Sequence, residues 1–288
     1  MGPPRSGRDG RDGRGKNQPR PRTQPARPPA ARRSPTPARG LGGEQVEGRQ
    51  AVRAVLAARR RRVRDIWLVD DVEASPILAE IRDLATSARV PIRPVSRERL
   101  QAEARTDAPQ GVLAHADALP EADFEQLASR RRGGAAPFLV ALDGVTDPHN
   151  LGALLRSAEC AGVTGVLLPR HRAAHVTPAV TKAAAGAAEY VAMAVVPGLP
   201  SALAALKERG VWTVGLAADA PTSVFDLEVA TEPVALVLGA EGRGLSRLVR
   251  QRCDLVVAIP QSGSTASLNV AAAGAIACFE IVRRRLTP

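Results

Sequence analysis

Residues 233–246, PVALVLGAEGRGLS, place a glycine-rich loop directly after a short apolar run. An apolar run of this length that ends at a turn is typical of a buried strand in a parallel sheet. Glycines after such a strand let backbone amides approach a ligand closely. The GxxGxG spacing departs from the dinucleotide-binding pattern GxGxxG, and the loop lacks the ending of a P-loop. Glu241 would repel a phosphate, so a ribose or a cationic sulfonium suits this loop better.

Similar apolar runs recur through the second half of the chain and alternate with helical patterns. They predict strands at residues 137–144, 165–169, 190–196, 211–217 and 253–260, and helices at 150–162, 177–188, 199–210 and 267–285. Alternation of this kind is typical of an α/β fold with an open parallel sheet. Because hydrophobic residues make up 44% of the chain and aromatic ones only 2%, Ala, Val and Leu must build the core.

A smaller α/β domain is predicted at residues 44–119. It would begin with a helix in VEGRQAVRAVLAA (46–58), where Val46, Val52, Val55 and Leu56 share one side. Strands are expected at residues 65–70, 90–95 and 110–116, with helices at 73–88 and 96–104. Residues 120–136 then form a charged linker, and residues 137–288 form the second domain.

Most of the net charge of +11 is concentrated in residues 1–43, which hold eleven Lys or Arg and two Asp or Glu. This segment has almost no large apolar residue, so we expect a disordered basic tail. Such a tail attracts phosphates without sequence preference. A leader that only aids solubility is the alternative.

Other features of the sequence point to a cytoplasmic protein. No apolar run approaches the length of about 18 residues that a membrane span needs, and the N-terminus lacks the apolar segment of a secretory signal. Cys160, Cys253 and Cys278 are far apart, as expected for small core residues in a reducing compartment.

Two further polar segments follow predicted strands. They are LDGVTDPHNLGALLRSAE (142–159) and IPQSGSTASLNV (259–270). In the first, Asn150 is either a helix N-cap or a functional residue, and Arg156 either a surface ion-pair partner or a functional one. The second is either a connector with a serine N-cap or part of a site. Ligands of open α/β sheets bind at the carboxyl ends of strands, where all three polar segments would meet.

In this order and spacing, the three segments resemble the LDxVxDPxNxGxxxRxAxxxG, LGxExxG and IPxxGxxxSLNVxxA motifs of the SpoU (TrmH) branch of the SPOUT RNA methyltransferases. The resemblance covers residues 137–285. Residues 44–119 resemble the small ribosomal-protein-like, RNA-binding domain of several members. The chain is most similar to the members that methylate a guanosine ribose of 23S rRNA.

This resemblance implies a C-terminal trefoil knot, a homodimer, an RNA substrate and S-adenosylmethionine as the cofactor, with no metal. General topology rules make knots nearly absent, so periodicity alone could not predict one. The cofactor would be held by Leu238, Gly239, Gly242, Ile259, Pro260, Ser267 and Leu268. The catalytic set would be Asn150, Arg156, Glu241, Ser267 and Asn269.

The implied reaction is an in-line attack of a ribose 2′-OH on the sulfonium methyl group, in which positioning is a large part of the task. The family assigns Arg156 to activation of the hydroxyl. A guanidinium is almost never neutral, so stabilisation of an alkoxide or anchoring of a phosphate is physically simpler than general-base catalysis. We expect Glu241 to orient Arg156. A tRNA or another rRNA site as substrate, and a ribosome-assembly factor that binds RNA without turnover, are the alternatives.

Two groups of basic residues allow more than one interpretation. The arginines at 59–62 and 64 either bind rRNA phosphates or form a solvated helix end. His171 and His175 are four residues apart, as metal ligands on a helix can be, but no carboxylate accompanies them, so a surface or RNA-facing position is expected.

Overall fold

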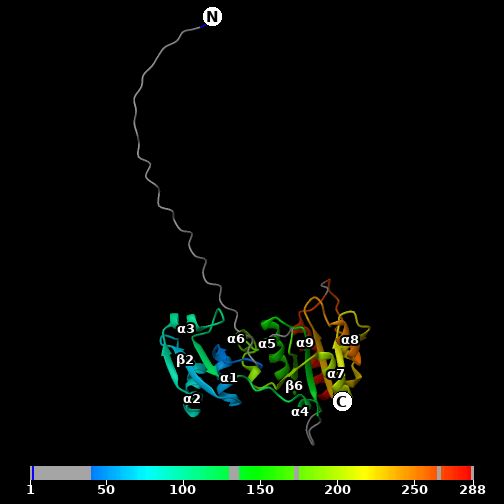
Figure 1. Cartoon of the computed structure of the whole chain (residues 1–288), viewed down its shortest axis with the longest axis horizontal. Helices are drawn as coiled ribbons and strands as arrows, with labels where there is room; N and C mark the ends of the chain where they lie inside the picture. The colour runs from blue at the N-terminus through cyan, green and yellow to red at the C-terminus, as the bar shows by residue number, and fades with distance from the viewer. Residues whose placement is uncertain (1, 3–39, 130–135, 172–174, 265–266, 287–288) are drawn as a thin grey trace, which may run out of the picture. The chain divides into compact units, whose positions relative to one another are not determined.

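The computed structural model describes residue 2 and residues 40–129, 136–171, 175–264 and 267–286, which form two sheets with helices packed on them (Figure 1). The small sheet has the strand order β1-β4-β2-β3. β4 is antiparallel to β1 and β2, and β3 is parallel to β2. The strands are β1 (Gln45–Glu47), β2 (Val63–Val69), β3 (Ile92–Val95) and β4 (Val112–Ala116).

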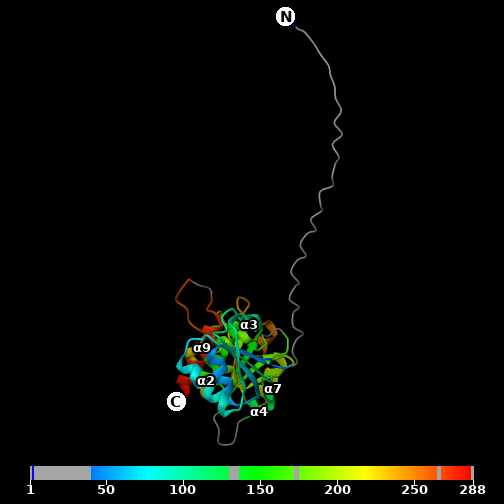
Figure 2. The same ribbon diagram turned by 90° about the vertical axis from the view of Figure 1, so that its left-hand side faces the viewer.

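Helices cover both faces of the small sheet. α1 (Arg49–Ala58) and α2 (Pro76–Ser87) enclose one core with Ile66 and Ala114. On the other face, Leu100 of α3 (Arg97–Glu103) packs on Val69 and Leu113. Figure 2 shows these elements from the side of the small sheet.

The large sheet has the order β7-β6-β5-β10-β8-β11-β9, and all of its neighbouring strands are parallel. This confirms the predicted α/β class with an open parallel sheet. Its strands are β5 (Phe138–Asp143), β6 (Gly165–Pro169), β7 (Met193–Val196), β8 (Trp212–Leu216), β9 (Thr222–Ser223), β10 (Val234–Gly239) and β11 (Leu255–Ala258).

Two cores lie on opposite faces of this sheet. α5 (Pro148–Cys160), α6 (Pro178–Ala183) and α9 (Val270–Leu286) pack on one face, whereas α4 (Phe124–Ala128), α7 (Leu199–Glu208) and α8 (Arg247–Arg252) pack on the other. Side chains of β10 alternate between the two: Leu236 and Leu238 face the first core, Ala235 and Val237 the second. Three short 3-10 helices complete the unit at Ala187–Glu189 (η1), Val224–Asp226 (η2) and Glu228–Thr231 (η3).

The structure corrects several expected boundaries. Val46 lies in strand β1, because Gly48 has a φ of 91° that a helix cannot continue through. The expected helix over 177–188 ends at Ala183, and Gly186 has a φ of 89°. Residues 120–136 contain helix α4, whose Leu127 is buried in the large unit. Leu41, expected in the tail, is 2% exposed and belongs to the core.

Two expectations concern residues outside the described ranges. Residues 1 and 3–39 of the expected tail lie outside the described residues. The predicted knot depends on the path of the chain through residues 265–266, which also lie outside them, so it stays a prediction. No helix within the described residues is both long enough and apolar enough to cross a membrane.

Candidate active site

A pocket of about 420 Å³ opens at the carboxyl ends of three adjacent strands, β8, β10 and β11. Leu216 ends β8, Gly239 ends β10, and Ile259 directly follows β11, and all three line the pocket. The loop 240–245 and the residues around the start of α9 form the remaining wall. Because parallel strands point the same way, segments that are distant in sequence meet at this edge.

The glycine-rich loop is a tight turn that folds back on the end of β10. Ala240 and Gly244 exchange backbone hydrogen bonds of 3.1 and 2.8 Å. A Cβ on Gly239 would lie 2.1 Å from the carbonyl carbon of Gly244, so no larger residue fits there. Gly242 and Gly244 have positive φ angles of 73° and 64°, which favour glycine. The three glycines of the motif therefore shape one wall of the pocket.

Asp143 holds this loop in place from the end of β5, the strand that pairs with β10. Its Oδ2 atom accepts a hydrogen bond of 2.6 Å from the backbone amide of Ser246. This hydrogen bond connects residues 142–159 to the glycine-rich loop and holds the residue that directly precedes α8.

Asn269 joins all three polar segments. Its Nδ2 group donates to Asn150 Oδ1 at 2.9 Å and to Glu241 Oε1 at 2.6 Å. Its Oδ1 atom accepts from the backbone amides of Ala271 and Ala272, which caps the start of α9. The side-chain amide therefore links the helix start to a carboxylate at the pocket wall and to a buried amide of α5.

Family models match both units. Residues 137–279 match the model described as "SpoU rRNA Methylase family", and residues 45–122 match "RNA 2'-O ribose methyltransferase substrate binding". The chain is 39% identical over 245 residues to the "23S rRNA (guanosine-2'-O-)-methyltransferase RlmB" of Pseudomonas putida, which covers 84% of this chain and 97% of the relative. The chain belongs to the SpoU rRNA methylase family.

Further relatives agree with this assignment. The RlmB of Haemophilus influenzae is 38% identical over 250 residues, which is 84% of this chain and 98% of that protein. Among solved structures, the SpoU methyltransferase AviRb from Streptomyces viridochromogenes, in complex with AdoMet, superposes with a TM-score of 0.71. It is 26% identical and covers 85% of this chain and 91% of its own.

The pocket of this SpoU family member contains most of the residues expected to bind a cofactor. Those that line it are Leu238, Gly239, Gly242, Ile259, Ser267 and Leu268. Pro260 instead lines an adjoining cavity of about 360 Å³, which shares Ala218, Ile259 and Gln261 with the pocket.

The residues expected to be catalytic are only partly brought together. Asn150, Glu241 and Asn269 form one hydrogen-bonded group, and Ser267 lines the pocket. Arg156 lies on α5 with an exposed side chain, and within the described residues this side chain forms no hydrogen bond or ion pair. The expected pairing of Arg156 with Glu241 is not found among these residues, because Asn269 donates to Glu241 instead.

The local roles of two amides also differ from those expected. Asn150 is not the N-cap of α5, since Asp147 accepts from His149 N at that end and Asn150 lies in the first turn, 7% exposed. Asn269, rather than a serine, caps α9. Both amides are thus placed for contacts between segments.

Asp219 and Arg250 line the pocket but were not predicted. Arg250 Nη1 donates to both carboxylate oxygens of Asp219, at 2.8 and 2.9 Å. The hydrogen bond from Arg250 holds the pKa of Asp219 below its usual value. The sequence feature that could have identified Asp219 is its position shortly after strand β8, which corresponds to the position of Glu241 after β10.

The cysteines and histidines add no second site. Within the described ranges, no group of three or more His, Cys, Asp or Glu side chains is arranged to hold a metal ion. Burial raises the pKa of the Cys253 thiol to about 11 and that of Cys278 to about 12. Cys160 is exposed at the end of α5, so its expected core position is wrong.

Proposed function

We propose that this protein transfers a methyl group from S-adenosylmethionine to the 2′-OH of a guanosine ribose in 23S rRNA. The observation that carries the proposal is the meeting of three separate segments at one pocket, joined through Asn269. The RlmB relatives, matched over nearly their whole length, support this substrate.

The pocket fits S-adenosylmethionine in size and in chemistry. Its volume of about 420 Å³ lies within the roughly 300–1,000 Å³ of small-molecule sites. Leu216, Leu238 and Leu268 offer apolar contacts for an adenine, and the glycine-rich loop offers backbone groups at close range. The carboxylate of Glu241 suits a cationic sulfonium, whereas that of Asp219 is already paired with Arg250. When bound, the cofactor supplies an electrophilic methyl group to an attacking oxygen.

The residues around the pocket would place the ribose and stabilise charge. Asn269 fixes the Glu241 carboxylate at the pocket wall, where it can accept a hydrogen bond from a ribose hydroxyl. Arg156 would act as a permanent cation that stabilises a developing alkoxide or anchors a neighbouring phosphate. This role suits the guanidinium of Arg156, which is exposed and has no hydrogen-bond or ion-pair partner among the described residues.

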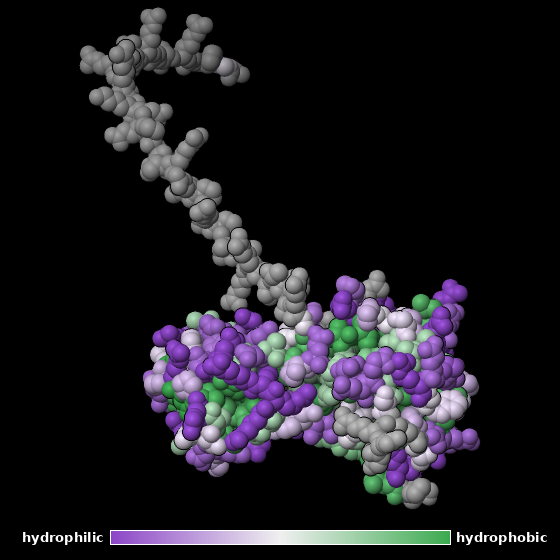
Figure 3. Space-filling view, turned by 60° about the horizontal axis from the view of Figure 1, so that its bottom comes forward, coloured by the Kyte–Doolittle hydropathy of each residue, from purple (hydrophilic) through white to green (hydrophobic). Residues whose placement is uncertain are grey.

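RNA binding would involve both units. Residues 45–122 match a substrate-binding model, and hydrophilic residues cover much of the face shown in Figure 3. Ribosomal RNA as substrate also implies a cytoplasmic protein.

We further propose a homodimer that forms through the outer face of α9. Ile276 and Phe279 are 37% and 48% exposed and lie one turn apart on that helix. A second copy would cover these apolar side chains and would bring its own residues close to Arg156 on the neighbouring α5. Phe279→Glu should therefore produce a monomer in analytical ultracentrifugation.

Incubation with labelled S-adenosylmethionine and either unmodified 23S rRNA or tRNA tests the proposed activity. A methylated ribose resists alkaline cleavage, so the modified position can be mapped. We expect one resistant guanosine in 23S rRNA and its loss with Arg156→Ala. Label in tRNA alone would overturn the substrate, and cofactor binding without transfer to either RNA would favour a binding protein.

A further inference from the structure

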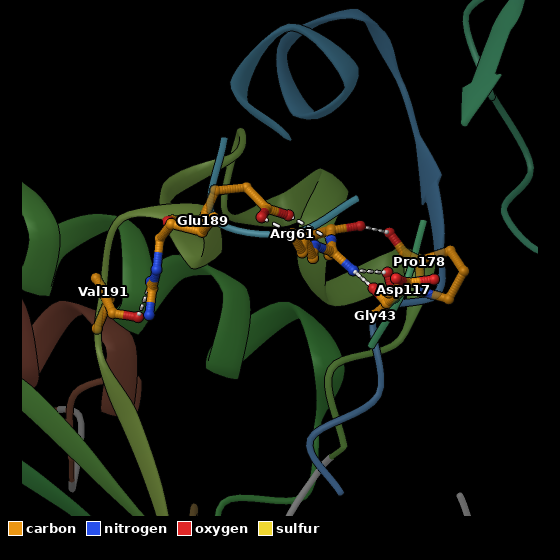
Figure 4. A network of polar contacts seen from close by, with 8 residues as sticks. Gly43, Arg61, Asp117, Pro178, Glu189 and Val191 are labelled. Carbon is orange, nitrogen blue, oxygen red and sulfur yellow. Dashed lines mark hydrogen bonds and ion pairs between the residues drawn. The ribbon is translucent and has the colours of Figure 1, made fainter. Parts of the chain in front are cut away.

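Arg61 and Glu189 form a buried ion pair between the small and large units (Figure 4). Arg61 precedes β2, and Glu189 ends η1. Both side chains are 2% exposed. Arg61 Nε and Nη2 donate to the two carboxylate oxygens of Glu189 at 3.0 and 2.5 Å. This parallel two-point geometry fixes direction as well as distance.

The third nitrogen of the same guanidinium also donates within the protein. Arg61 Nη1 donates to the carbonyl oxygens of Gly43 and Asp117, each at 2.6 Å. The neighbouring Arg60 donates from Nη1 to the carbonyl oxygens of Glu189 and Val191, at 3.0 and 3.1 Å. Two consecutive arginines therefore hold one short segment of the large unit.

Close backbone contacts surround the pair. A Cβ on Gly186 would lie 2.3 Å from the Cβ of Ala54 in α1, so the turn before η1 rests directly on that helix. The same Cβ would lie 3.1 Å from the carbonyl oxygen of Gln50. The contact between the units is thus packed tightly and held at several points.

A buried ion pair adds little net stability, because removing two charges from water costs about as much as their attraction returns. The pair instead restricts the relative orientation of the two units, because any orientation that separates Arg61 from Glu189 would leave a buried charge without a partner. We propose that the Arg61–Glu189 pair is a positioning device, which holds the small unit in one orientation so that RNA bound there presents its target ribose to the pocket. This inference rests on the proposed function.

The pair also divides the arginine run at 59–62 by role. The Arg61 side chain is buried and donates four hydrogen bonds within the protein, so it is not available to an rRNA phosphate. Arg62 is exposed, and its side chain forms no hydrogen bond or ion pair within the described chain. A loss of activity on changing Glu189 could not be explained by a lost RNA contact, because this carboxylate is buried and negatively charged.

Glu189→Gln, Glu189→Asp and the control Arg62→Ala test the proposal in the full chain. Glutamine keeps the size of the side chain but loses the charge, whereas aspartate keeps the charge but is shorter. For Glu189→Gln we expect kcat on 23S rRNA to fall on the order of tenfold to a hundredfold, with methyl groups spread over neighbouring riboses. RNA affinity should stay within about twofold, and cofactor affinity should not change.

Glu189→Asp should recover part of the rate and of the site selectivity. Arg62→Ala should weaken RNA binding without spreading the methylation. The proposal is wrong if Glu189→Gln retains rate and selectivity, or if glutamine is tolerated better than aspartate, because the side chain would then only fill space.

Calorimetry without RNA separates this inference from the proposed function. Wild-type protein should unfold in one transition, and Glu189→Gln in two, as the units become independent. If wild-type protein methylates no RNA, the proposed function fails while this comparison still decides whether the pair couples the units. Identical single transitions in both proteins would overturn the coupling.

Discussion

Asn269 has two roles that require an amide side chain. Its oxygen caps α9, and its nitrogen donates to Asn150 and Glu241. A carboxylate could replace only the acceptor, and a hydroxyl could not reach the same set of partners from one side chain. The residue therefore connects the start of a helix to the polar wall of the pocket.

Asn269→Asp separates these two roles. It keeps the cap but loses both donors and places a second carboxylate beside Glu241. Hydrogen bonds to charged groups contribute about 1.5–3 kcal/mol, so kcat should fall on the order of tenfold to a hundredfold. Asn269→Ala should lose the cap as well, which costs about 1 kcal/mol of the free energy of unfolding. Steady-state kinetics and urea unfolding measure the two effects, and full turnover by Asn269→Asp would contradict the assigned role.

At the scale of elements, the apolar runs predicted the long strands of the large sheet because both faces of that sheet are buried. The missed elements are short. β9 has two residues, and α8 is a six-residue helix anchored by one fully buried side chain, Val249. The break after α6 arises at Ala185 and Gly186, which have φ angles of 49° and 89°, and at Gly186 the contact with α1 leaves no room for a side chain. Such packing has no local sequence signal.

The same limit applies to the candidate site. Motif resemblance selected Asn150, Glu241 and Asn269, which the structure joins by hydrogen bonds. It did not select Asp219, because no motif includes the end of β8. Motif resemblance also could not identify the hydrogen-bond donor to Glu241, because this depends on how α5, the glycine-rich loop and α9 meet in space.

Gly239→Ala tests whether the glycine-rich loop shapes the pocket. The added Cβ would meet the backbone of Gly244 at 2.1 Å, so the loop must move away from β10. Gly242→Ala is the matched control, because its Cβ has no neighbour within 4 Å and only its φ of +73° is unfavourable. Titration calorimetry with S-adenosylmethionine should show a much larger loss of affinity for Gly239→Ala, and equal losses would contradict this account.

Asp254 links β11 to β8 and makes stability depend on pH. Its Oδ2 atom accepts from Thr213 N at 3.0 Å and Oγ1 at 2.7 Å, and Lys207 pairs with Oδ1. Burial alone would raise the pKa of Asp254, but the hydrogen bonds from Lys207 and Thr213 outweigh it and lower the pKa.

A lowered folded-state pKa means that this stabilisation is present above the unfolded value of about 3.9 and is lost as the pH falls through the folded value. Asp254→Ala should therefore reduce the free energy of unfolding by about 1–3 kcal/mol at neutral pH. The difference from wild type should shrink below about pH 4. Urea unfolding across this range checks the sign, and a difference that grows on acidification would refute it.

At the scale of the whole molecule, charge is unevenly distributed along the chain. Residues 1–43 hold eleven of its 40 Lys and Arg residues, and only two of its 29 Asp and Glu residues. Composition reveals this asymmetry directly, whereas the buried contact between the two units could not be predicted because it joins residues that are 128 positions apart.

Removal of residues 1–39 should weaken RNA binding without changing kcat. Each phosphate contact that is lost reduces the slope of log K against log salt by about 0.7–0.9. Binding assays at several salt concentrations therefore measure the contribution of the tail. Unchanged affinity and slope would favour a tail that only aids solubility.

Mass spectrometry of the nucleosides from treated 23S rRNA tests the central claim most directly, because it identifies the atom that receives the methyl group. RNA transcribed without modification would be incubated with the protein and deuterated S-adenosylmethionine, and then digested completely. We predict that 2′-O-methylguanosine carries the label and that no other nucleoside does. Label on a base, or no labelled nucleoside despite cofactor binding, would contradict the claim.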